Sequence, residues 1–193
     1  MRRSKLLILI ILLLPLLGGC AAAVVGGVAA GTAVVNDRRP TGVYIDDQQL
    51  EFAALEIKYK DDEISQKTNI NVISYNLVLL MTGQAESKAV VDRYASQLSK
   101  LARVKRVQNY VQIGAEGTWS DATSDAYLTT KAKLALFEVD QEGFNPGHVK
   151  VTTSLDTVYL MGIVTRAEGR AAADAVRYVS GVKRVVTLFE YFD

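Results

Sequence analysis

The chain contains the same arrangement of residues twice. A strand-like apolar run reaches Gly83, and the tetrapeptide Val-Lys-Arg-Val begins at Val104; a second such run reaches Gly162, and the same tetrapeptide begins at Val182. The two glycines are 79 positions apart and the two tetrapeptides 78. Recurrence in the same order at a nearly constant spacing indicates a duplicated module of roughly 65–75 residues, at the small end of domain sizes.

The N-terminus is predicted to be an export signal covering residues 1–19. Three basic residues precede the apolar run Leu6–Leu17, which is shorter than the ~20 residues that a membrane-spanning helix needs. The only cysteine, Cys20, excludes a disulfide within the chain. Leu17-Gly18-Gly19-Cys20 resembles the lipobox of bacterial lipoproteins, which implies cleavage before Cys20 and acylation of it. Ala21 at the next position implies delivery to the outer membrane.

Removal of the signal changes the charge balance of the protein. The signal holds three of the 22 basic residues and none of the 21 acidic ones, so 19 basic residues remain against 21 acidic and the net charge is −2. Such a chain is not a polycation, and nucleic acid is not a predicted partner. Attraction to anionic lipid would have to come from a local patch of charge.

Residues 20–42 are predicted to be an acylated arm and linker. Ala21–Val35 consists of Ala, Val, Gly and one Thr, and it is too short to span a bilayer. The spacing of Gly27 and Gly31 would allow close helix contact in a membrane. The alternative is a small-residue tether that lies near the bilayer surface. Residues 36–42 are polar and turn-forming, which is typical of a linker.

The first module, residues 43–113, is predicted to fold as helix, strand, strand, helix, strand. Its first helix is expected to be capped by Asp47, its hairpin to turn at Asn76, and its second strand to end at Gly83. A second helix should start near Ser87, before a last strand over residues 104–113. The carboxylates of residues 61–63 are expected to be a solvated loop and not a metal site, because no histidine lies nearby.

The second module, residues 124–193, repeats this order after a linker over residues 114–123. Its first helix is expected to be capped by Ser124-Asp125, and its hairpin to turn at Leu155-Asp156. An alanine-rich helix over residues 168–179 and a strand over 182–192 complete it. Trp119 in the linker is expected to pack in the seam between the modules. The predicted fold is therefore α+β: two αββαβ modules, each a three-stranded mixed sheet packed against two helices.

These features resemble the BON domain. The second copy carries the clearest signature, in residues 149–153, 158–162 and 179–185, and with the lipobox the chain resembles the outer-membrane lipoproteins that have two BON domains. The resemblance implies a protein without enzymatic activity that faces the periplasm and supports envelope integrity. It also implies that the second domain binds anionic phospholipid, especially phosphatidylglycerol, and that this binding helps to localise the protein at division sites.

The resemblance places lipid contact on the first helix of the second module, where the family has an inserting tryptophan. Tyr127 stands at that position. Tyr127 and Leu134 are expected to enter the headgroup boundary, with Leu128 beside them if it is not buried. Lys131 and Lys133 are expected to meet phosphates, each worth about 1 kcal/mol near an anionic surface. The alternative is that Tyr127 packs against the first module and the lysines are only solvated.

No catalytic residue, metal ligand or cofactor is predicted. His148 is the sole histidine, and the sequence has no glycine-rich phosphate loop and no cysteine other than Cys20. The rival function is a protein-binding scaffold, an adaptor for an outer-membrane assembly machine or a division complex. Exposed strand edges and the seam around Trp119 would serve that role without direct lipid recognition.

Overall fold

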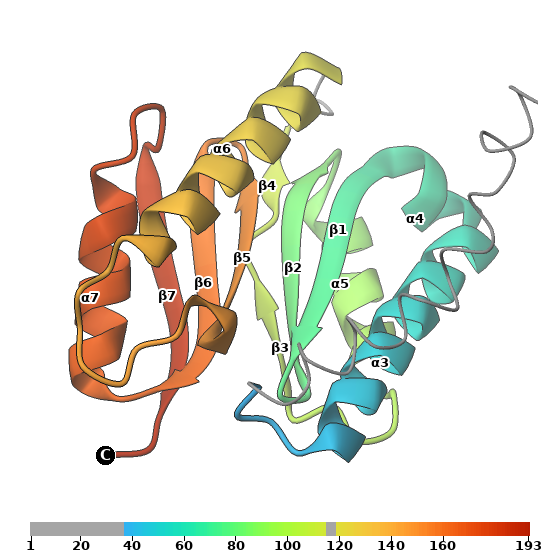
Figure 1. Ribbon diagram of the computed structural model, residues 1–193. Coiled ribbons are helices and arrows are strands. Elements are labelled where there is room, and N and C mark those ends of the chain that lie inside the picture. Colours follow the sequence, from blue (N-terminus) through green and yellow to red (C-terminus); the bar gives the residue numbers. More distant parts are fainter. Residues whose placement is uncertain (1–36, 115–118) are drawn as a thin grey trace, which may run out of the picture. The chain divides into compact units, whose positions relative to one another are not determined.

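The computed structural model describes residues 37–114 and 119–193, with side chains omitted at 119–121. The predicted signal, Cys20 and the arm through residue 36 lie outside the described residues, as does the side chain of Trp119. Residues 38–193 form one compact unit. Figure 1 shows its elements in chain order from blue to red.

Module 1 adds one short helix to the predicted order. Its elements are α3 (Thr41–Lys60), α4 (Asp62–Lys67), β1 (Thr68–Tyr75), β2 (Val78–Ala85), α5 (Lys88–Leu98), β3 (Arg106–Asn109) and β4 (Gln112–Ile113). The expected solvated loop at residues 61–63 is wrong. Asp61 caps α4 by accepting from the amides of Glu63 and Ile64, and its carboxylate also lies 2.8 Å from Arg93. The last strand is split into β3 and β4, both parallel to β2.

Module 2 follows the predicted order more closely. Its elements are α6 (Trp119–Phe137), the 3₁₀ turn η3 (Pro146–His148), β5 (Val149–Ser154), β6 (Thr157–Val164), α7 (Arg166–Arg177) and β7 (Arg184–Tyr191). The hairpin pairs β5 and β6 antiparallel, and β7 lies parallel to β6 after the crossover through α7. Module 1 has the same order, β1-β2-β3, and the same directions. The mixed sheets and the α+β class are confirmed.

The two sheets pack face to face, which produces four layers: helices, sheet, sheet, helices (Figure 1). The inner face joins Tyr75, Val78 and Leu80 of module 1 to Tyr159 and Met161 of module 2. The rings of Tyr110 and Tyr159 meet edge to face across this seam, with centroids 5.3 Å apart. The side chain of Tyr159 is only 1% exposed there, and this burial raises its pKa. Both β2 and β6 have covered faces on two sides, which explains their unbroken apolar runs over residues 78–81 and 158–161.

The repeated glycines do not end their strands, contrary to expectation. β2 continues past Gly83, and β6 continues past Gly162. A Cβ on Gly83 would lie 2.1 Å from the carbonyl oxygen of Asn69, and its φ is +111°; a Cβ on Gly162 would lie 2.5 Å from the carbonyl oxygen of His148. Each glycine therefore allows the edge strand of the hairpin to approach closely.

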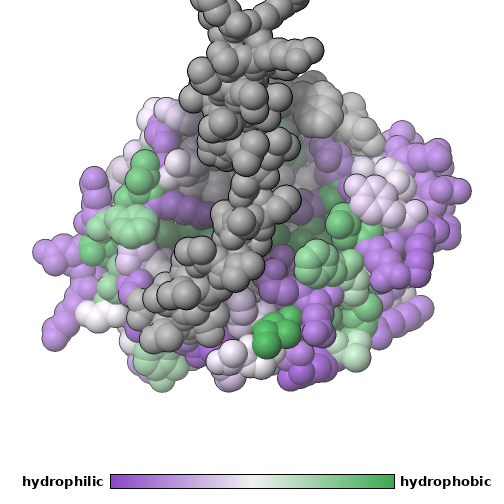
Figure 2. All heavy atoms as spheres, turned by 45° about the vertical axis from the view of Figure 1, so that its right-hand side comes forward, coloured by the Kyte–Doolittle hydropathy of each residue, from purple (hydrophilic) through white to green (hydrophobic). Residues whose placement is uncertain are grey.

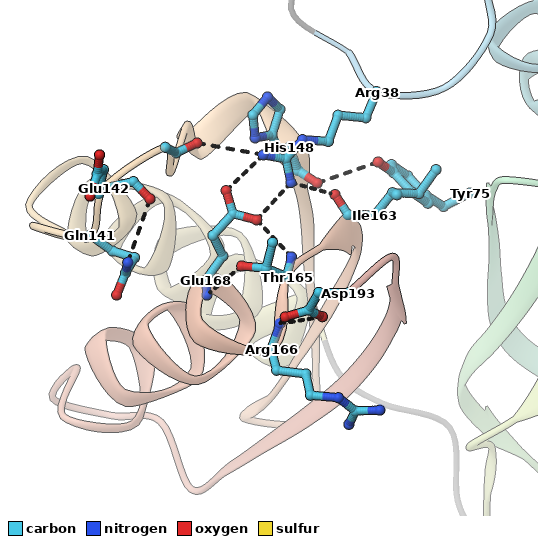
Figure 3. Close-up of polar contacts among 11 residues, drawn as sticks. Arg38, Tyr75, Gln141, Glu142, His148, Ile163, Thr165, Arg166, Glu168 and Asp193 are labelled. Atoms are coloured by element: carbon cyan, nitrogen blue, oxygen red, sulfur yellow. Dashed lines mark hydrogen bonds and ion pairs between the residues drawn. The ribbon is translucent and has the colours of Figure 1, made fainter.

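Two arginines in the predicted linker contact different modules. Arg38 reaches module 2, where its guanidinium binds both carboxylate oxygens of Glu168 at 2.7 Å and the carbonyl of Ile163 at 3.0 Å (Figure 3). Glu168 is only 2% exposed and also completes a capping box with Thr165 at the start of α7. Hydrogen bonding from Arg38, which outweighs burial, lowers the pKa of Glu168 to about 2.

Arg39 turns into module 1. It lies 2.7 Å from the buried carboxylate of Asp47, and its guanidinium sits 4.1 Å from the centre of the Tyr75 ring. Arg38 and Arg39 lie just before α3, so the start of this helix is bonded to module 2 through Arg38 and to module 1 through Arg39.

Candidate functional site

The orientation of α6 is set by an aspartate that binds the neighbouring hairpin. Asp125 accepts hydrogen bonds from the amides of Leu155 at 2.8 Å and Asp156 at 3.0 Å. Both turn residues have positive φ, +52° and +57°, as a type I′ turn requires. The prediction that Ser124-Asp125 caps the helix is wrong, because α6 begins earlier, at Trp119. Asp125 lies inside the helix and aims its carboxylate at two turn amides.

Asp47 has the same function in module 1. The predicted cap is again wrong, since α3 begins at Thr41 and Asp47 lies well inside it. Its carboxylate accepts from the amides of Asn76 and Leu77, each at 2.8 Å, and from the hydroxyl of Ser74 at 2.6 Å. Each first helix is thereby fixed against its own hairpin.

The inward face of α6 is a single row of residues packed over the sheet. Leu128, Ala132 and Leu136 are all at most 3% exposed. Lipid contact by Leu128 was expected only if its side chain is not buried, and the structure does not meet that condition. The four-residue spacing places Leu128 in the buried row, where its side chain covers Gly181. The remaining predicted contacts lie outside this row.

The outward face of α6 presents three large apolar side chains. Tyr127 is 64% exposed, Leu134 61% and Phe137 74%. Seven residues at ~100° each place Leu134 within about 20° of Tyr127 around the helix, and Phe137 follows one turn later. We call Tyr127, Leu134 and Phe137 the outer face of α6. The sequence prediction missed Phe137, although its position three residues after Leu134 was a usable signal.

Lys131 belongs to the border of this outer face. Its ammonium donates to the carbonyl of Ser180 at 2.6 Å and lies 5.4 Å from the centre of the Tyr127 ring. The alternative that Tyr127 packs against module 1 is not what the structure shows, because the ring is largely exposed beside a lysine of its own helix.

Lys133 is separated from the other predicted contacts. Six residues beyond Tyr127 on the helix, it points ~120° away, toward the side of α6 that borders module 1. It lines a cavity of about 310 Å³ with Arg39, Tyr44 and Lys150, and a cavity of about 240 Å³ with Phe137. The predicted patch is therefore two sites: the outer face with Lys131, and Lys133 at the seam.

The first helix of module 1 also exposes apolar residues. Ile45, Phe52, Leu55 and Tyr59 of α3 are each about half exposed or more. In the space-filling view, hydrophobic side chains form separate small patches between hydrophilic ones (Figure 2). α3 and α6 thus both carry apolar residues on two faces, whereas the buried residues of α5 and α7 lie on one face.

His148 lies at the end of η3, where its backbone carbonyl accepts a hydrogen bond from the hydroxyl of Tyr75 at 3.3 Å. Within residues 37–114 and 119–193, no group of three or more His, Cys, Asp or Glu is arranged to hold a metal ion. In the same residues, no helix is both long enough and apolar enough to cross a bilayer.

Comparison with known proteins identifies both modules. The BON domain model matches residues 46–115 and 124–191, more than half of the chain. The chain is 34% identical to outer membrane lipoprotein DolP of Haemophilus influenzae over 165 residues, which cover 86% of this chain and 84% of that protein. It is 28% identical to a 21 kDa hemolysin of Actinobacillus pleuropneumoniae over 155 residues, covering 80% and 79%.

Among solved structures, a similar one is that of CdsD, a structural protein of the type III secretion system of Chlamydia trachomatis. The identity is 14%, the match covers 76% of this chain and 63% of that one, and the TM-score is 0.30, too low to bear on the fold. The family assignment rests on the domain model and on the sequence relatives: the chain belongs to the BON-domain family and carries two copies of the domain.

Proposed function

We propose that this protein is an outer-membrane lipoprotein, anchored through acylated Cys20 and facing the periplasm, that supports envelope integrity. Its second BON domain binds anionic phospholipid, phosphatidylglycerol in particular, and this binding helps to place the protein at division sites. The location is supported by the relative that is 34% identical, which is named as an outer membrane lipoprotein. The lipobox at Leu17–Cys20 supports the anchor.

The observation that carries lipid binding is the outer face of α6. Three large side chains, two of them aromatic, are exposed on one helix whose opposite side is held firmly to the sheet. Aromatic rings are suited to the boundary between headgroups and acyl chains. Lys131 beside Tyr127 supplies a cation at the same depth. A weak contact is sufficient, because the lipid anchor already confines the protein to the membrane surface.

The test is sedimentation with vesicles of phosphatidylglycerol and phosphatidylcholine, using the chain from residue 20 onward with Cys20→Ser so that no acyl chain contributes. We expect Tyr127→Ala to lower binding about five- to tenfold, because roughly 1 kcal/mol of interfacial burial is lost. Lys131→Glu should lower binding to the anionic vesicles alone. Tyr59→Ala is the matched control, since Tyr59 is 68% exposed on the first helix of module 1. Equal binding by all the variants contradicts the proposal.

Placement at division sites requires a separate measurement in cells. Fluorescent fusions of the acylated protein should concentrate at the septum, and Tyr127→Ala should spread the signal over the envelope while leaving the protein in the membrane fraction. Retention of the septal signal by this variant would separate localisation from lipid binding.

The second candidate is a protein-binding scaffold for an outer-membrane assembly or division complex. The exposed residues Phe52, Leu55 and Tyr59 on α3 favour it, because an apolar outer face on a helix is typical of an interface. A photo-crosslinking residue at position 52 or 127 distinguishes the two functions in intact cells. One dominant protein adduct from position 52 that persists with Tyr127→Ala supports the scaffold. Lipid adducts from position 127 support phospholipid binding.

A further inference from the structure

The seam beside α6 contains two adjoining cavities of different character. Lys133, Gly147 and Val149 line both of them, so the cavities form one groove along the flank of the helix. The groove has a polar end of about 310 Å³ and an apolar end of about 240 Å³. Their combined size falls within the ~300–1,000 Å³ of small-molecule sites.

The polar end lies where the two modules meet. Tyr44, Gln48 and Tyr75 come from module 1 and Arg39 from the segment before it, whereas Lys133 and Lys150 come from module 2. The guanidinium of Arg39 is held by Asp47 at 2.7 Å, and the ammonium of Lys150 by Glu51 at 2.6 Å and the carbonyl of Ser74 at 3.0 Å. These ion pairs fix the two cations in place.

The polar end offers one ammonium to an anion. Of the three cations that line it, Arg39 pairs with Asp47 and Lys150 with Glu51. The third is Lys133, for which the contacts among the described residues include no hydrogen bond or ion pair. By contrast, Lys131 two residues earlier is bound to Ser180. A phosphodiester carries one negative charge and acceptor oxygens for an ammonium.

The apolar end is built from Leu136, Phe137, Pro146 and Val149. Leu136 and Val149 belong to the core and make its floor, whereas Phe137 is 74% exposed and forms its outer wall. Phe137 also belongs to the outer face of α6. One side chain therefore connects the groove with the surface proposed to meet the membrane.

We propose that this groove binds a single anionic glycerophospholipid, with the phosphodiester on Lys133 at the polar end and part of one acyl chain against Phe137 at the apolar end. This inference rests on the proposed affinity for anionic phospholipid and names where one lipid molecule sits. It separates two roles on α6: the outer face adsorbs to the bilayer, whereas the groove holds a lipid. Because its polar end includes residues of both modules, the groove requires the seam to be formed.

The test uses soluble short-chain lipids below the concentration at which they form micelles, with the same Cys20→Ser chain. Amide resonances of Gly147 and Val149 are followed by NMR during titration with dihexanoyl phosphatidylglycerol, dibutanoyl phosphatidylglycerol and inorganic phosphate. We expect saturable shifts and about tenfold tighter binding of the dihexanoyl lipid than of the dibutanoyl lipid, because two more methylenes of one chain leave water. Phosphate alone should bind far more weakly than either.

The variants separate the groove from the outer face. Lys133→Glu should lower the affinity for dihexanoyl phosphatidylglycerol at least tenfold. Tyr127→Ala and the charge control Lys100→Glu should bind this lipid as tightly as the unaltered chain does. Binding unaffected by Lys133→Glu, equal affinity for both chain lengths, or phosphate binding as tight as the lipid would each overturn the groove. If the short-chain lipids do not bind but the chain still sediments with vesicles, the lipid site in the groove is contradicted and the proposed function is not. If neither binding is observed, the proposed function is contradicted as well.

Discussion

The first helices of the two modules, α3 and α6, share their inner faces and differ in their outer faces. Leu50 and Ala54 of α3 correspond to Leu128 and Ala132 of α6, 78 positions apart, and all four are buried. Asp47 and Asp125 are also 78 apart and bind equivalent hairpin turns. The inner face is dictated by the fold, so it is the same in both copies.

Their outer faces share only one apolar position. Tyr59 corresponds to Phe137, and the two are 68% and 74% exposed. Elsewhere the apolar positions differ: Tyr127 and Leu134 of α6 correspond to Gln49 and Glu56 of α3, whereas Phe52 and Leu55 of α3 correspond to Thr130 and Lys133 of α6. A duplicated module can change its outer surface without cost to its core, so the specific function of each copy is to be sought where the outer faces differ.

The largest expected difference between the modules concerns the two turn-binding aspartates. Asp47→Ala should destabilise the protein by about 3–5 kcal/mol, because it removes the carboxylate that pairs with the buried Arg39 and that accepts three further hydrogen bonds. Asp125→Ala leaves two partly buried backbone amides without their acceptor and should lower the free energy of unfolding by about 1–2 kcal/mol. Urea unfolding followed by circular dichroism measures both. Equal losses would mean that Arg39 adds nothing to the turn of module 1.

The repeated glycines should also respond unequally. Gly83→Ala combines a clash with the Asn69 carbonyl and a φ of +111°, for an expected loss of about 2–4 kcal/mol. Gly162→Ala has the clash without the positive φ and should lose about 1–3 kcal/mol. Thermal unfolding of the two variants gives the order. A smaller loss at Gly83 would show that the edge strand β1 moves aside more readily than β5.

Acid should act on the second module through Glu168, which has no titratable counterpart in module 1, where Val90 stands at the equivalent position. Because its pKa falls from 4.5 to about 2 on folding, its contribution is complete above about pH 4.5 and is lost as the pH falls toward 2. Glu168→Gln should cost on the order of 2 kcal/mol at pH 7.

Unfolding from pH 7 down to pH 2 tests this assignment. The difference in the free energy of unfolding between the unaltered protein and Glu168→Gln should shrink as the pH falls. The difference between the unaltered protein and Arg38→Ala should shrink over the same pH range. A difference that stays constant down to pH 2 would mean that the Arg38 pair contributes no stability.

The smallest expected effect on stability is that of substituting Tyr59 and Phe137, the corresponding exposed residues of α3 and α6. Phe137→Ser and Tyr59→Ser should each change stability by no more than about 0.5 kcal/mol, because both side chains are exposed. Phe137→Ser should lower binding to phosphatidylglycerol vesicles about fivefold, whereas Tyr59→Ser should leave it unchanged. Equal losses would extend the membrane contact to α3 and remove the proposed distinction between the modules.

The repeat predicted the order of elements that the two modules share and the direction of their strands, because local periodicity and turn residues determine both; it did not predict α4 or the division of the last strand of module 1. The two turns at Asn76 and at Leu155-Asp156 were located for the same reason. The aspartates were misassigned because an acidic residue just before an apolar row is typical of a helix cap. Both aspartates lie inside their helices because each helix begins about six residues earlier, at Thr41 and at Trp119. These first turns have little apolar periodicity, so the sequence did not indicate that they are helical.

Contacts between distant segments could not be predicted. The pairing of Arg38 with Glu168 spans 130 positions, and no local pattern marks either residue as a partner. The face-to-face sheets left a trace in the unbroken apolar runs of β2 and β6, but a run alone does not say what covers its second face. At the candidate site, the spacing of Leu128, Ala132 and Leu136 was sufficient to place Leu128 in the core. The surroundings of Lys133 could not be predicted in this way, because they include residues of module 1.

The contacts of Arg38 and Arg39 bear on how mechanical force would enter the molecule. In the proposed anchored form, a pull along the chain from the membrane side reaches Arg38 and Arg39, one bonded to each module, before it reaches α3. Part of the load therefore passes directly to module 2 through the ion pair of Arg38 and Glu168. Tension on the anchor would in this way act on both modules and not on module 1 alone.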